Sequence, residues 1–75
     1  MRISKSILRE KVEILNGMVE ETYTLDYAYG GVRLCRCTNE HGGLSDMSER
    51  VTQSEMGRIL DTVISVVAYK KYNHN

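Results

Sequence analysis

The chain has 75 residues, of which 41% are hydrophobic and 27% are charged, and its formal net charge at neutral pH is zero. This composition is typical of a folded domain, and a neutral chain lacks the basic excess of most proteins that bind the nucleic-acid backbone. Two cysteines form at most one bridge, which excludes the disulfide-rich secreted class. We expect one small domain over residues 1–75, without membrane contact, in the cytoplasm.

Residues 4–16 are predicted to form the first helix. Apolar residues recur there at helical spacing, and Ser4 is a suitable N-cap. Asn16-Gly17 is expected to end the helix, because glycine adopts the left-handed conformation of a helix C-terminus without steric cost.

Residues 22–38 are predicted to form a β-hairpin. Apolar and polar residues alternate along both strands, and Gly30-Gly31 supplies the positive φ angles of a two-residue turn. With this turn, Tyr29 faces Val32 and Tyr27 faces Leu34 on the side expected to meet the core. The opposite side is expected to be open, and it carries Thr24, Asp26, Ala28, Arg33, Cys35 and Cys37.

A second turn over residues 39–43 and a short strand over residues 44–47 follow. The last helix opens with a capping box formed by Thr52 and Glu55 and continues with an apolar stripe. The order is therefore α-β-β-β-α. We expect an α+β fold in which a three-stranded antiparallel sheet carries two helices on one face, as a two-layer sandwich.

Cys35, Cys37 and His41 make a spacing that suits zinc or a reactive thiol. A fourth strong ligand is missing from this group. The alternative interpretation is that both cysteines are small residues of the strand surface and that His41 is a loop residue. We therefore expect no cofactor and no catalytic residue, and these three residues remain candidates for a metal site.

Polar and aromatic residues around the two turns are the candidates for binding a small ligand. They are Tyr27, Tyr29, Arg33, Asn39, Glu40, His41 and Asp46. Two other interpretations stay open: the tyrosines are core residues, or they stack on bases in a nucleic-acid-binding protein whose basic patch is Lys5, Arg9, Arg33 and Arg36.

The α-β-β-β-α order resembles the double-stranded-RNA-binding domain, although the last helix starts with Thr52 and Glu55 where that family depends on lysines. The string Leu25 to Gly31, followed by Asn39-Glu40, Gly42-Gly43 and Asp46, resembles small uncharacterised proteins of bacteriophages, prophages and other mobile elements. That resemblance implies a setting and no activity.

The expected function is that of a non-enzymatic binding or accessory protein in a bacterial host cell. It contacts a host protein or a small ligand such as a signalling nucleotide, and it works as a homo-oligomer. Two alternatives stay open, a nucleic-acid-binding module and a protein with a Cys/His metal or thiol site.

Overall fold

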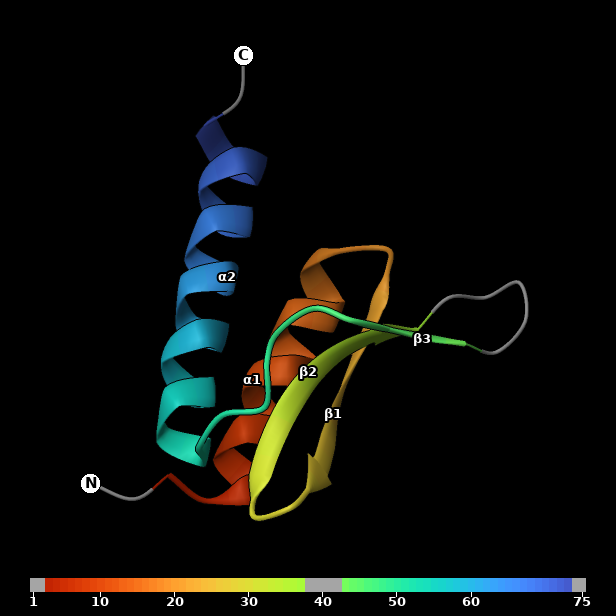
Figure 1. The fold of residues 1–75 in the computed structure, drawn as a ribbon. Coiled ribbons are helices and arrows are strands. Elements are labelled where there is room, and N and C mark those ends of the chain that lie inside the picture. The colour runs from red at the N-terminus through yellow and green to blue at the C-terminus, as the bar shows by residue number, and fades with distance from the viewer. Residues whose placement is uncertain (1–2, 38–42, 74–75) are drawn as a thin grey trace.

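A computed structural model describes residues 3–37 and 43–73, which form a layer of two helices against a three-stranded antiparallel sheet (Figure 1). The elements are α1 (Lys5–Met18), β1 (Thr22–Ala28), β2 (Gly31–Cys37), β3 (Leu44–Asp46) and α2 (Gln53–Asn73). The central strand is β2, with β1 and β3 on either side. The predicted α-β-β-β-α order and the α+β class are therefore confirmed.

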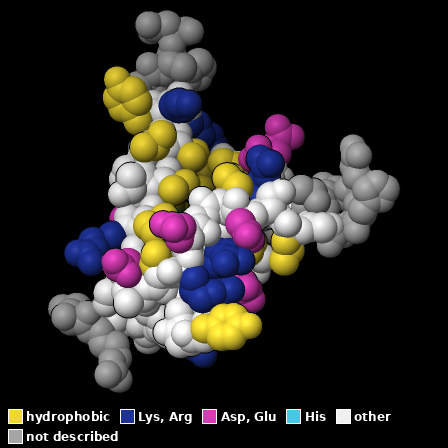
Figure 2. All heavy atoms as spheres, in the orientation of Figure 1, with side chains coloured by type: hydrophobic (Ala, Val, Ile, Leu, Met, Phe, Trp, Pro, Cys, Tyr) yellow, Lys and Arg dark blue, Asp and Glu magenta, His cyan; other side chains and the backbone are white. Residues whose placement is uncertain are grey.

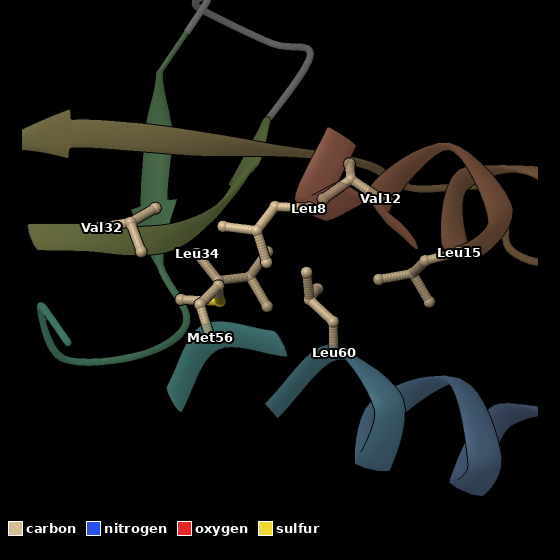
Figure 3. Packing of buried hydrophobic residues seen from close by; sticks show 7 residues of the cluster. All are labelled: Leu8, Val12, Leu15, Val32, Leu34, Met56 and Leu60. Atoms are coloured by element: carbon tan, nitrogen blue, oxygen red, sulfur yellow. The ribbon is translucent and has the colours of Figure 1, made fainter. Parts of the chain in front are cut away.

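The core lies between the two helices and one face of the sheet. Leu8 occupies its centre and points between side chains of β2 and α2 (Figure 3). Because members of both helices contact the same face of β2, both helices share one side of the sheet. The buried residues of this core are Leu8, Val12, Leu15, Val32, Leu34, Met56 and Leu60.

Side-chain capping defines the start of α1, but the predicted end of this helix is wrong. Ser4 is the N-cap, and its hydroxyl accepts a hydrogen bond from the Ile7 amide at 3.3 Å. The helix continues to Met18, with Gly17 inside it. The Asn16 side chain bonds the main-chain N–H and C=O of Tyr23 at 2.8 and 3.0 Å, so it ties the end of α1 to β1.

The hairpin turn lies one residue earlier than predicted. Its two central residues are Tyr29 and Gly30, with φ angles of 53° and 73°. Val32 therefore pairs with Tyr27, and the strands are shifted by two residues from the expected register. Because side chains alternate with a period of two, this shift leaves every strand residue on its predicted face. It moves Tyr29 out of the strand and away from the core.

Close packing explains why Gly31 belongs to β2 and not to the turn. A Cβ atom at this position would lie 2.9 Å from Arg50 Cγ and 3.0 Å from the Val51 carbonyl oxygen. Val51 pairs with Val32 through two main-chain hydrogen bonds of 2.7 and 2.8 Å. Gly31 therefore lets the segment before α2 approach the end of β2, which is a requirement that the sequence pattern does not display.

The predicted capping box at the start of α2 is confirmed. The Thr52 amide donates to Glu55 Oε1 at 3.0 Å, and the Glu55 amide donates to Thr52 Oγ1 at 3.1 Å. The hydrogen bond from the Thr52 backbone lowers the pKa of the Glu55 carboxyl, and the bond from the Thr52 side chain adds to the effect. The ionised carboxylate is thus the form that supports the helix start.

We expect Glu55→Gln to reduce the acid sensitivity of folding. The folded-state pKa of Glu55 is lower than its unfolded-state pKa. The ionised carboxylate therefore contributes to folding stability above the unfolded-state pKa, and this contribution is lost as the pH falls through the folded-state pKa. Urea unfolding between about pH 3 and 7 measures this dependence. Glu13→Gln, at an exposed position of α1, is the control. If the free energy of unfolding of Glu55→Gln fell with decreasing pH as steeply as that of the parent, the ionised Glu55 carboxylate would not be what supports the helix start.

Candidate functional site

A hollow of about 270 Å³ lies at the turn end of the hairpin. Lys5 and Gln53, which are the first residues of α1 and α2, contribute to its wall, so both helices begin at this end of the molecule (Figure 1). The remaining wall comes from the hairpin. The full lining is Lys5, Tyr27, Ala28, Gly30, Gly31 and Gln53.

Lys5 and Tyr27 form the polar part of this hollow. The Lys5 ammonium lies 4.7 Å from the centre of the Tyr27 ring, within the range of a cation–π contact. Among residues 3–37 and 43–73, no carboxylate lies within ion-pair distance of Lys5. Burial raises the pKa of the Tyr27 hydroxyl, so this group stays protonated at neutral pH and can donate a hydrogen bond.

Tyr29 lies outside the hollow. Its side chain is 97% exposed at the tip of the hairpin, so the expectation that it faces the core is wrong. The Arg50 guanidinium lies 5.6 Å from the Tyr29 ring centre and 2.8 Å from a carboxylate oxygen of Asp26. Arg50 also donates to the carbonyl oxygen of Asp26 at 3.0 Å. Arg50 therefore binds the turn end of the hairpin. This role of Arg50 was not predicted from the sequence.

The outer face of the sheet, opposite the helices, carries paired charges. Arg33 Nη1 lies 3.2 Å from Asp46 Oδ2, and Asp26 binds Arg50 as described. Lys or Arg side chains lie beside Asp or Glu side chains over the hairpin (Figure 2). The structure thus brings two of the predicted site residues, Arg33 and Asp46, together, but on the opposite face of the sheet from Tyr27. The predicted site residues Asn39, Glu40 and His41 lie outside the described residues.

The two cysteines have different environments. Cys35 was expected on an open face, yet it is only 2% exposed. Its thiol donates to Asp46 Oδ1 at 3.8 Å, and burial, followed by the charges of Asp46 and Asp26, raises the pKa of this thiol. Cys37 is a half-buried free thiol.

A metal site at the cysteines requires a third ligand close to them. Within the described parts of the chain, no group of three or more His, Cys, Asp or Glu side chains is placed to hold a metal ion. The candidate ligand His41 lies outside those parts.

We expect the two thiols to react at very different rates in the native protein. Cys37 should react quickly with a disulfide reagent, while Cys35 should react only when the protein opens, because it is buried and its raised pKa keeps the thiol protonated. Single Cys35→Ser and Cys37→Ser variants, followed with a chromogenic disulfide reagent, separate the two rates. Equal rates in the two variants would contradict this prediction.

The alternative basic patch is divided between surfaces. Arg33 points from the outer face, where it is bound to Asp46, whereas Lys5 and Arg9 lie on α1 on the other side of the sheet. The sequence placed Tyr27 in a ligand site and Lys5 in a separate basic patch, and it gave no role to Gln53. The available signal was that both predicted helices are capped at their starts, immediately before Lys5 and Gln53.

Neither helix in the described part of the chain combines the length and the hydrophobicity of a membrane span. Comparison of the chain with protein-family models, with curated proteins and with solved structures gave no match.

Proposed function

We propose that the protein is a non-enzymatic binding module that holds a small anionic ligand in the hollow at the turn end of the hairpin. The observation that carries this proposal is Lys5, a cation at the rim of the hollow that contacts an aromatic ring and has no described carboxylate partner. A ligand anion supplies the missing partner for this ammonium.

The chemistry of the lining favours a ligand with an anionic group joined to a small polar body. Lys5 supplies positive charge, the Tyr27 hydroxyl supplies a hydrogen-bond donor, and the Gln53 amide supplies both a donor and an acceptor. Gly30 has no side chain, and no atom lies within 4 Å of the position of a Cβ atom there, so a ligand can approach its backbone closely.

The size of the hollow restricts the ligand further. Its volume of about 270 Å³ is just below the roughly 300–1,000 Å³ of sites that enclose drug-sized ligands. A mononucleotide or a smaller phosphate ester suits this volume better than a dinucleotide does. The resemblance to small phage and mobile-element proteins supports an accessory role in the bacterial cytoplasm, where such a ligand is a metabolite or signal of the host.

Titration with AMP and with inorganic phosphate, followed by amide NMR shifts, tests the proposal. We expect AMP to move the signals of Lys5, Gly30, Gly31 and Gln53, and phosphate alone to move fewer of them. Lys5→Gln should weaken AMP binding about tenfold or more, because a charge-assisted hydrogen bond contributes about 1.5–3 kcal/mol.

Arg9→Gln is the matched control, because Arg9 is an exposed cation of the same helix and does not line the hollow. This variant should bind AMP as the parent does. Absence of shifts around the hollow at millimolar AMP, or equal affinity of Lys5→Gln and the parent, would exclude the hollow as the ligand site.

Self-association belongs to the same proposal, because a core of this size is stabilised when more apolar surface is buried. Ligand binding in the hollow does not require it.

A further inference from the structure

The C-terminal half of α2 has more apolar surface than the rest of the chain covers. Six of the seven residues at positions 63–69 are apolar, and Ser65 is the exception. A helix that is apolar on all sides is normally buried on all sides. Here Val66 is 50% exposed and Tyr69 is 68% exposed, and hydrophobic side chains lie along α2 toward its C-terminal end (Figure 2).

The same segment is a weak helix former by composition. Four of the five residues at positions 63–67 are β-branched, and these residues lose side-chain freedom in a helix. The two helices start at the same end, and α2 has 21 residues against 14 in α1, so the last part of α2 extends beyond α1 (Figure 1). Val63, Ile64 and Val67 pack against the edge of the core, whereas Val66 lies outside it, so part of this apolar segment has no cover within one copy.

We propose that a second copy of this chain covers this surface by antiparallel pairing of the two α2 helices. The two-fold axis passes between Thr62 and Val63. Ile59, Val63 and Val66 are spaced four and three residues apart, so they form one strip along α2. Antiparallel pairing about this axis places Ile59 of one copy opposite Val66 of the other, and each contact occurs twice.

Charge complementarity favours this arrangement and this orientation. Glu55 and Lys70 extend the strip at its two ends, and both are exposed. In the antiparallel register, Glu55 of one copy lies opposite Lys70 of the other, so two ion pairs flank the apolar contact. A parallel pairing would place Lys70 beside Lys70. The zero net charge of the chain adds no general repulsion between copies.

Sedimentation equilibrium of the ligand-free protein from about 1 to 300 µM tests the dimer, with the melting temperature measured over the same range. We expect a monomer–dimer equilibrium and a melting temperature that rises with concentration. Val66→Glu should raise the dimer dissociation constant about 100-fold or more, because each dimer would bury two unpaired charges. Ser65→Glu adds the same charge on an exposed position outside the strip, and it should leave the constant unchanged.

Lys70→Glu tests the orientation. It places like charges opposite each other in the antiparallel pair and should raise the dissociation constant severalfold at low salt, with a smaller effect at high salt. A monomer at every concentration, open-ended assembly, or a Val66→Glu variant that dimerises as the parent does would overturn the proposal. Because no ligand is added, these outcomes are independent of those for the hollow.

Discussion

Leu8→Ala should remove a large part of the free energy of unfolding of this protein. Leu8 is fully buried and lies between β2 and α2, so its truncation leaves a cavity that both helices and the sheet line. Leu→Ala changes in such positions cost about 2–5 kcal/mol. A domain of this length has a total stability of about 4–11 kcal/mol, so this loss removes much of it.

Ile14→Ala is the matched control for this variant. Ile14 is an aliphatic residue of the same helix, but it is 55% exposed. Its truncation should change the free energy of unfolding by less than about 1 kcal/mol, because little area is lost and alanine favours the helix. Urea unfolding of both variants measures the difference. Equal losses would mean that Leu8 is not at the centre of the core.

Two glycine-to-alanine changes should have opposite effects on stability. Gly31→Ala should destabilise the protein by about 1–3 kcal/mol, because the new Cβ atom meets both Arg50 and the main chain of Val51. The segment before α2 must then move away from β2, which weakens the two hydrogen bonds between Val32 and Val51. Gly17→Ala should instead stabilise the protein by about 0.5–1 kcal/mol.

The gain at Gly17 follows from its place inside α1, where a Cβ atom meets nothing within 4 Å and alanine costs less backbone entropy than glycine. Thermal unfolding of the two variants and the parent in one buffer shows whether each change raises or lowers the stability. If Gly31→Ala proved as stable as the parent, the segment before α2 would not approach Gly31 as closely as the structure shows. Loss of stability in Gly17→Ala would mean that α1 ends before this residue.

The parts of the fold that sequence reasoning predicted depend on residues that are close in the chain. The caps at Ser4 and Thr52 act within three or four residues, so local spacing identifies them. Alternation along the hairpin identified the face that carries Val32 and Leu34. It did not identify the register, because a shift of two residues preserves every face.

Part of the candidate site was also open to prediction from sequence. Tyr27 was expected to contact a ligand, and it lines the hollow, while Arg33 and Asp46 meet on the other side of the sheet. Lys5 was expected in a basic patch, and its meeting with Tyr27 and Gln53 was not expected, because it depends on how two helices 35 residues apart pack on one sheet. The same limit applies to Arg50, which binds Asp26 at a sequence separation of 24 residues.

Local sequence thus determines the elements of this protein, their caps and the faces they bury. Tertiary packing decides the position of the hairpin turn, the burial of Cys35 and the formation of the hollow. At Gly31, the approach of the Arg50-Val51 segment selects the turn, since only glycine leaves room for it. Contacts of this kind join residues far apart in the chain, and no periodicity of hydrophobic or turn residues encodes them.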